Sequence, residues 1–141
     1  MKSPKRAVQL VLLFTFGGVC YGAMEILWRG FTHWTMAVLG GVCFVVIGVL
    51  NSRFREDMPL CSRMVISTFV ISTGEFITGV IVNICLNWSV WDYSLMPYNI
   101  FGQVCLKWCM IWFWLSLVAI VLDSWLRYKW FGASKPRYKV F

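Results

Sequence analysis

Four long apolar stretches occupy most of this chain of 141 residues. A helix needs about 20 apolar residues to cross the hydrocarbon core of a bilayer. The stretches that meet or approach this length are residues 7–28, 34–50, 64–86 and 104–126. Only 13% of the residues are charged, against about 25% in soluble domains. The sequence therefore predicts an all-α fold, a single four-helix transmembrane bundle made of two hairpins.

These four spans and their short connections leave no room for a soluble catalytic domain. The chain has no GxxxxGK[ST] phosphate-binding loop, so an ATPase would have to be a separate chain. We find no nucleophile–histidine pair and no cluster of metal-ligand residues, and the six cysteines contain no CxxC pair. Cysteine packs well between helices. We therefore expect no enzyme activity, no metal site and no cofactor.

Basic residues predict the orientation of the spans. They gather before the first span, between the second and third, and after the fourth; they are Lys2, Lys5, Arg6, Arg53, Arg55, Arg63, Arg127, Lys129, Lys135, Arg137 and Lys139. The other two connections hold only Arg29, with Lys107 just inside the fourth span. The positive-inside rule then places both termini in the cytoplasm, with the protein in the plasma membrane. Contacts with anionic lipid explain the net charge of +7 without a nucleic-acid partner.

Trp and Tyr residues flank the spans, as expected for side chains that prefer the membrane interface. The predicted outer belt consists of Trp28, Trp34, Trp88, Trp91, Tyr93, Tyr98 and Trp108. We expect these rings to lie at the level of the lipid headgroups.

Glu75 is the first functional candidate because it lies near the middle of the third span. An acidic residue at the centre of a membrane helix costs roughly 2.5–3.5 kcal/mol on insertion scales, so it usually faces inward and has a function. No basic residue lies at a comparable depth on the other spans. A carboxyl group in this setting favours its neutral form and can exchange a proton. Glu75 is thus either a proton-, cation- or substrate-binding group, or a neutral acid bonded to a neighbouring helix.

Small and polar residues continue from Glu75 along one helix face. Thr68, Ser72 and Gly79 follow the helical spacing, and Asn83 lies one turn beyond Gly79. This face is expected to point into the bundle or toward a partner subunit.

Glycines are dense in the first two spans, and they are Gly17, Gly18, Gly22, Gly40, Gly41 and Gly48. Faces of small residues let helix backbones approach closely in lipid, so we interpret these glycines as packing seams. Each half of the chain also has a glutamate on its first span, Glu25 or Glu75, and a Trp-bearing external loop. These shared features have two interpretations: the two hairpins are related as a parallel repeat, or they are similar by chance.

Near the outer end of the first span, Glu25 has two candidate partners. Arg29 lies four residues further along the same helix, which permits an ion pair. Lys107 lies at a similar depth on the fourth span, from which it could also extend to the headgroups. Either pair could shape an outer vestibule or simply hold the helices.

The external connection 87–103 is long for so small a bundle and rich in aromatic and hydrogen-bonding side chains. Asp92 and Asn99 are placed to bond the turn that Pro97 imposes, and Gln103 closes the segment. The connection is either a lid over a pathway or a plug at the membrane surface.

Several of these residues also form a family pattern. The segment GEFITG at 74–79, followed by Asn83, by WDYS at 91–94 and by Pro97, Asn99, Gly102 and Cys105, resembles the bacterial ABC-transporter permeases of type IV. Residues 21–25, YGAME, are similar to the glutamate-bearing first span of that family. The resemblance covers most of residues 14–126, although the first half lacks the Asn-Arg-Gly and Gly-Pro loop pattern of many members. It implies transport, with a separate ATPase subunit.

We therefore expect a transport protein or permease subunit with an internal or intersubunit polar path. Its expected residues are Glu75, Thr78 and Asn83 on the third span, Glu25 and Lys107 near the outer mouth, and Asp92, Asn99 and Gln103 in the covering loop. A homo-oligomer is expected because four helices barely enclose a solvated path. The alternatives are a holin-like pore and a non-transporting membrane assembly factor.

Overall fold

The computed structural model describes residues 5–141 and contains four long helices. They are α1 (Arg6–Arg29), α2 (Trp34–Phe54), α3 (Leu60–Gly79) and α4 (Leu106–Phe131). A π-helix, η1 (Val80–Cys85), continues α3. All four, with α3 and η1 taken together, are long and apolar enough to cross a membrane. The predicted four-helix membrane bundle is confirmed; Lys2, used in the orientation argument, lies outside the described residues.

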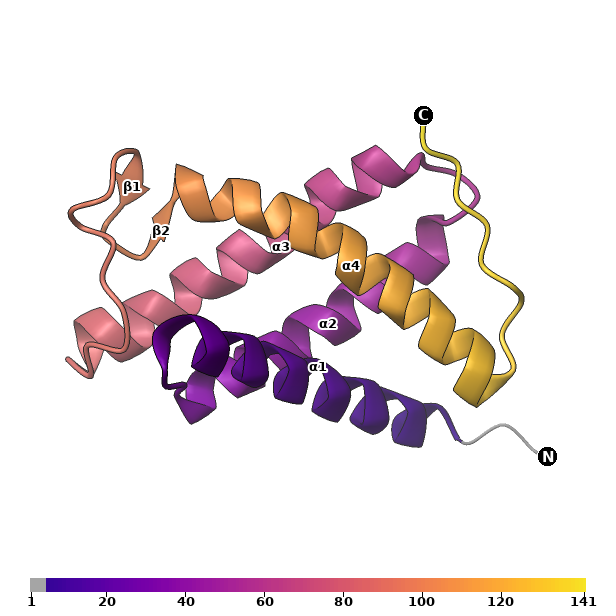
Figure 1. Ribbon diagram of the computed structural model, residues 1–141, viewed down its shortest axis with the longest axis horizontal. Helices are drawn as coiled ribbons and strands as arrows, with labels where there is room; N and C mark the ends of the chain where they lie inside the picture. Colours follow the sequence, from indigo (N-terminus) through magenta and orange to yellow (C-terminus); the bar gives the residue numbers. More distant parts are fainter. Residues whose placement is uncertain (1–4) are drawn as a thin grey trace.

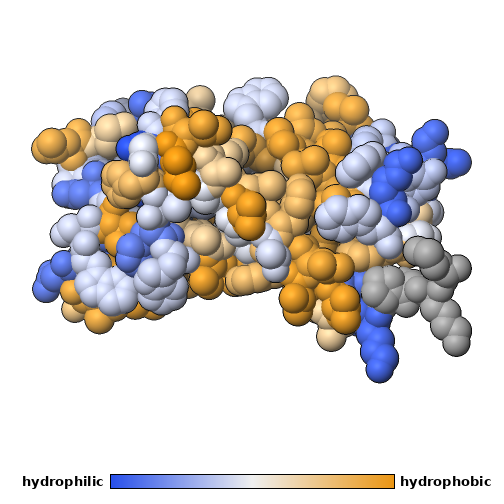
Figure 2. All heavy atoms as spheres, turned by 60° about the horizontal axis from the view of Figure 1, so that its bottom comes forward, coloured by the Kyte–Doolittle hydropathy of each residue, from blue (hydrophilic) through white to orange (hydrophobic). Residues whose placement is uncertain are grey.

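The bundle has two distinct ends (Figure 1). One carries the start of α1, the C-terminal tail and the connection between α2 and α3, and we call it the tail end. The other, the loop end, carries residues 30–33 and the long connection 86–105. That connection contains two short antiparallel strands, β1 (Asn99–Ile100) and β2 (Val104–Cys105). Figure 2 shows an apolar band between two more polar ends, as expected for a protein surrounded by lipid.

The helix ends differ from the predicted spans for local reasons. α2 continues to Phe54 rather than Leu50, because the helix extends beyond the continuous apolar stretch through three polar residues, 51–53. α4 begins only at Leu106, since residues 104–105 form β2. α1 and α4 are each followed directly by a glycine, Gly30 and Gly132, whose φ angles of 81° and 70° place them in the left-handed conformation that commonly terminates helices.

The N-terminus of α3 is closed by the C-terminal tail. Pro59 precedes the helix and provides no side-chain cap. The backbone N–H of Leu60 instead donates to the carbonyl of Lys139 at 2.6 Å, and Arg55 donates to the Ser134 hydroxyl at 2.7 Å. The tail therefore satisfies a helix-end donor that would otherwise lack a partner.

Helices α1 and α2 pack along a glycine seam, as predicted. A Cβ atom on Gly18 would lie 2.7 Å from the carbonyl oxygen of Ala37, and one on Gly41 would lie 2.7 Å from that of Phe14. Such distances are too short for a carbon atom, so only glycine permits this approach of the two backbones.

Helix α4 packs mainly against α2 and α3, and its backbone approaches that of α1 closely at few points at most. Aromatic side chains span the gap between α1 and α4. The ring centroids are 6.0 Å apart for Trp28 and Trp108, 5.9 Å for Tyr21 and Trp112, and 6.2 Å for Phe16 and Trp130. The space between these rings forms the cavities described next.

Candidate functional site

Two partly open cavities lie side by side between α1 and α4. The one nearer the loop end has a volume of about 250 Å³, and the one nearer the tail end about 120 Å³. They share lining from Tyr21, Met24, Trp112 and Leu115, so the two spaces adjoin. Nearly all other lining side chains are apolar or aromatic, which suits an occupant with substantial apolar surface.

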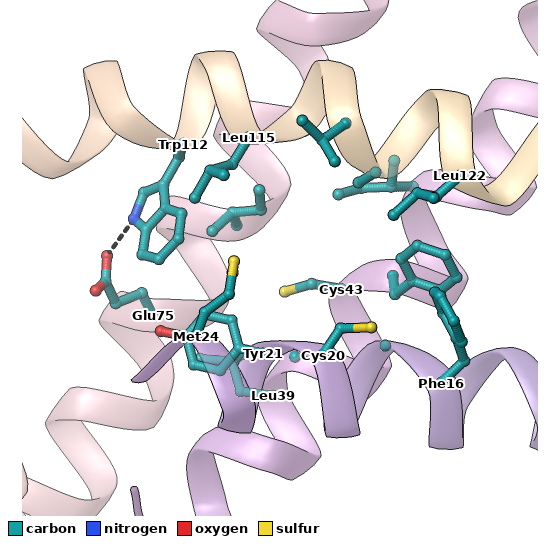
Figure 3. Close-up of a pocket in the computed structure, with 17 residues that line it drawn as sticks. Phe16, Cys20, Tyr21, Met24, Leu39, Cys43, Glu75, Trp112, Leu115 and Leu122 are labelled. Atoms are coloured by element: carbon teal, nitrogen blue, oxygen red, sulfur yellow. Dashed lines mark hydrogen bonds between the residues drawn. The ribbon is translucent and has the colours of Figure 1, made fainter. Parts of the chain in front are cut away.

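Glu75 lines the smaller cavity beside Tyr21 and Trp112, which line both cavities, and it is only 1% exposed. The indole N–H of Trp112 on α4 donates to its Oε2 atom at 3.0 Å, and the hydroxyl of Tyr93 in the loop donates to its Oε1 atom at 3.1 Å. Figure 3 shows Glu75 at one end of the smaller cavity, with Phe16 and Leu122 at the other. Both carboxyl oxygens therefore have a neutral hydrogen-bond donor from another element.

Glu75 has no basic partner among residues 5–141. The ion pairs in this part of the chain join Glu25 to Arg29 and Asp123 to Arg127. Hydrogen bonds from neutral groups stabilise a buried carboxylate less than a paired cation does. The site can therefore accept a positive charge, whether as a proton or as part of a ligand.

Aromatic side chains dominate the larger cavity. Those that line it are Tyr21, Trp28, Trp91, Tyr93, Trp108 and Trp112. Trp108 lies at the centre of this group, with ring centroids 6.0 Å from Trp28, 5.6 Å from Trp112 and 6.2 Å from Tyr93. The rings thus form a connected wall that leads from the loop end to Glu75.

The long connection is held against η1 by Asn83. The Asn83 side chain accepts from the Val90 N–H at 2.7 Å and donates to Gln103 Oε1 at 2.8 Å. The Trp91 indole donates to the Gln103 carbonyl at 3.0 Å. A Cβ atom on Gly79 would lie 2.5 Å from Gln103 Oε1, so glycine gives the loop room to dock. π-Helical turns are frequent at functional sites, and this one places Asn83 where it can anchor the loop.

This docking brings Tyr93 to Glu75. Burial raises the pKa of Tyr93 above its ordinary value, so its hydroxyl stays protonated and can donate. The connection therefore contributes a side chain to the buried site, which the lid interpretation requires and the plug interpretation does not.

Two predicted loop residues stabilise the loop itself. Asp92 is exposed and accepts hydrogen bonds from the backbone N–H, at 2.8 Å, and the hydroxyl of Ser94, and these bonds hold its pKa below its ordinary value. Asn99 donates to the Met96 carbonyl at 2.8 Å and accepts from the Gly102 N–H at 2.9 Å. Neither residue lines the cavities.

Of the two partners considered for Glu25, the structure selects Arg29. Their side chains are 3.0 Å apart, and Thr32 also donates to Glu25 at 2.8 Å. Arg29 donates in turn to the Val90 carbonyl at 3.0 Å, which joins α1 to the long connection. Lys107 is exposed and forms no ion pair with Glu25. Thr78 is half-buried and lies outside both cavities.

Several site residues were not predicted for this role. Four residues of the predicted outer belt line the larger cavity instead, and they are Trp28, Trp91, Tyr93 and Trp108. Tyr21 and Trp112 were not singled out. The i, i+4 spacing of Trp108 and Trp112 predicts a shared helix face, but nothing in the sequence says that this face turns toward α1.

A second polar cluster lies at the tail end. Arg63 is 3% exposed and donates through Nη1 to the side-chain oxygen of Asn51, which donates to the Ser124 hydroxyl at 2.9 Å. The Nε and Nη2 atoms of Arg63 have no partner within residues 5–141. Nearby on α4, Asp123 forms an ion pair with Arg127 at 2.9 Å. The described residues contain no group of His, Cys, Asp and Glu side chains able to hold a metal ion.

Comparison with known proteins agrees with the family pattern in the sequence. No solved structure matches this chain. The family model described as "Putative ABC-transporter type IV" matches residues 7–139, which includes all four helices and the long connection. The chain therefore belongs to this family and is a multi-pass membrane protein related to transport.

Proposed function

We propose that this protein is a permease component that binds its substrate between α1 and α4, with Glu75 as the central polar contact. The observation that carries the proposal is the place of Glu75, buried in the lining of the smaller cavity beside rings that also line the larger one, and without a basic partner among the described residues. Intramembrane acidic residues commonly mark substrate or ion pathways.

The packing of α1 supports a route into this site. Its contact with α2 is a seam of glycines, whereas aromatic side chains span the gap to α4. Side chains can change rotamer without moving the helices. A substrate could therefore enter between α1 and α4 while the α1–α2 pair stays intact.

The remaining parts of the proposal follow from the charge pattern and the family. Both termini lie in the cytoplasm and the protein resides in the plasma membrane as a homo-oligomer. A separate chain supplies the ATPase, and this chain is not an enzyme. Glu75 is the principal pathway residue, while Asn83 and Gln103 position the loop that covers it.

Ion conductance in planar bilayers tests the role of Glu75. Purified wild-type protein and the Glu75→Gln variant, which keeps the shape and removes the charge, are compared at equal amounts. A conductance that the substitution changes would place Glu75 on a path that works without a partner. If neither protein conducts ions, the protein is not an autonomous pore, and a permease would then need an ATPase that copurifies with it from native membranes. Absence of a copurifying ATPase would contradict the permease proposal.

A non-transporting assembly factor is the second candidate. The loose contact between α1 and α4 favours it, because an apolar opening of this kind could accept a helix of another membrane protein. A photo-crosslinker at Val118, an exposed lining residue of the smaller cavity, would identify such a partner in native membranes. Crosslinking to a single non-ATPase membrane protein would favour this candidate.

A further inference from the structure

We propose that the paired cavities bind a hydrophobic organic cation, whose charge is met by Glu75 and by the faces of the surrounding aromatic rings. This inference rests on the proposed function and names its substrate class. It depends on three observations: the aromatic wall, the carboxyl group of Glu75, which has no basic partner among the described residues, and the distribution of fixed positive charge around them.

The aromatic wall suits a cation that carries apolar groups. Tyr and Trp side chains from α1, α4 and the long connection line one space of about 250 Å³. An organic cation over such a ring gains about 0.5–1 kcal/mol at exposed sites and about 2 kcal/mol when desolvated. Cages of aromatic rings are the common solution for quaternary ammonium groups. An anion would face the negative side of the same rings and be repelled.

Glu75 supplies the opposite charge. Tyr93 and Trp112 each donate one hydrogen bond to it, one to each carboxyl oxygen, whereas a carboxylate can accept about four hydrogen bonds. The group therefore remains able to contact a bound cation. Trp112 and Tyr21 line both cavities beside it, so the aromatic and acidic parts of the site can act on one ligand.

The fixed positive charges near the site do not oppose this ligand. Arg29 lines the larger cavity, but its charge is paired with Glu25 at 3.0 Å. Lys107 is exposed and lines neither cavity. The charged side chains that line the two cavities are Glu25, Arg29 and Glu75, and their formal charges sum to one negative charge when both acids are ionised. A single positive charge on the ligand would neutralise it.

Isothermal titration calorimetry on the purified full-length protein in a nonionic detergent tests this inference. The probes are phenyltrimethylammonium and benzenesulfonate, which share one aromatic ring and carry opposite charges. We expect saturable binding of the cation and none of the anion. Glu75→Gln should weaken cation binding by at least about tenfold, and Trp108→Leu by roughly tenfold.

Trp114→Leu is the matched control, because Trp114 is on the same helix, is 65% exposed and lines neither cavity. It should bind the cation as the wild type does. Equal binding of both probes, cation binding that survives Glu75→Gln, or no saturable binding to folded wild type would overturn the inference. If Glu75→Gln fails to fold, equal loss in Trp108→Leu and Trp114→Leu would overturn it as well. Because no transport is measured, these outcomes are separate from the conductance test of the proposed function.

Discussion

The two helix hairpins are held together in different ways. Helices α1 and α2 meet through glycines, so close that added Cβ atoms would collide with backbone carbonyls. Helices α3 and α4 meet through side chains, including Ser72 with Cys109 and Glu75 with Trp112. The first hairpin is thus suited to a fixed frame, and the second to holding polar groups that could contact a ligand.

The two glutamates show the same contrast. Glu25 pairs with Arg29 one turn away on its own helix, so its charge is neutralised locally. Glu75 relies on donors from α4 and the long connection. Their similar positions in the two halves of the sequence therefore do not give them the same chemical role.

The largest loss of stability is expected from adding methyl groups to the glycine seam between α1 and α2. The double variant Gly18→Ala/Gly41→Ala places two methyl groups against carbonyl oxygens at 2.7 Å. Overpacking costs about 1–3 kcal/mol per site, so we expect the two sites together to lose about 2–6 kcal/mol of unfolding free energy. Thermal unfolding in detergent, followed by circular dichroism, measures it.

Gly22→Ala is the control on the same helix, since a Cβ atom there would lie 3.8 Å from Thr32. It should be neutral or slightly stabilising, because alanine favours helix by up to about 1 kcal/mol over glycine. Equal stability of the seam variant and the control would show that α1 and α2 are not held by backbone approach.

A smaller effect is expected when Glu75 loses its acceptors. Glu75→Leu leaves the buried indole N–H of Trp112 and the Tyr93 hydroxyl without their partner. An unpaired buried donor costs about 1–3 kcal/mol, and we expect a net loss of about 2 kcal/mol. Glu75→Gln keeps one acceptor oxygen for the Trp112 N–H, and its NH2 group can donate to the Tyr93 hydroxyl oxygen, so it should lose less than about 1 kcal/mol. If the two variants are equally stable in the same thermal assay, the second hairpin does not depend on these bonds.

Release of the long connection should be a local event. Asn83→Ala removes the acceptor of the Val90 N–H and the donor to Gln103, at a cost of about 1–2 kcal/mol. Hydrogen exchange at Val90 and Trp91 should accelerate, while α1 and α2 stay protected. Leu95→Ala, at a side chain that is 100% exposed in the same connection, should leave exchange unchanged. Acceleration across all four helices would mean that the connection stabilises the whole bundle.

Much of the fold could be predicted because span length and apolar composition are local properties. The candidate site was harder to predict, because its parts come from α1, α3, α4 and the long connection. Glu75 was identified by the cost of a charge in lipid, a property of one residue. Trp108 and Tyr93 were assigned to the membrane interface, since an aromatic residue near a span end has the same sequence signature whether it faces headgroups or a cavity. Only the packing of α4 relative to α1 distinguishes the two.

The smallest effect concerns the hydroxyl that joins the connection to α3. At pH 8, Tyr93→Phe should lose about 1 kcal/mol of unfolding free energy, the usual contribution of one hydrogen bond. Burial raises the pKa of folded Tyr93, whereas in the unfolded chain tyrosine ionises near pH 10. The unfolded state therefore releases a proton from Tyr93 above about pH 10 that the folded state retains, and this contribution, which Tyr93→Phe lacks, destabilises the wild type as the pH rises. The stability difference between wild type and variant should shrink above pH 10, which thermal unfolding at pH 8 to 11 would measure. A constant difference over that range would mean that Tyr93 ionises equally in both states and is not enclosed with Glu75.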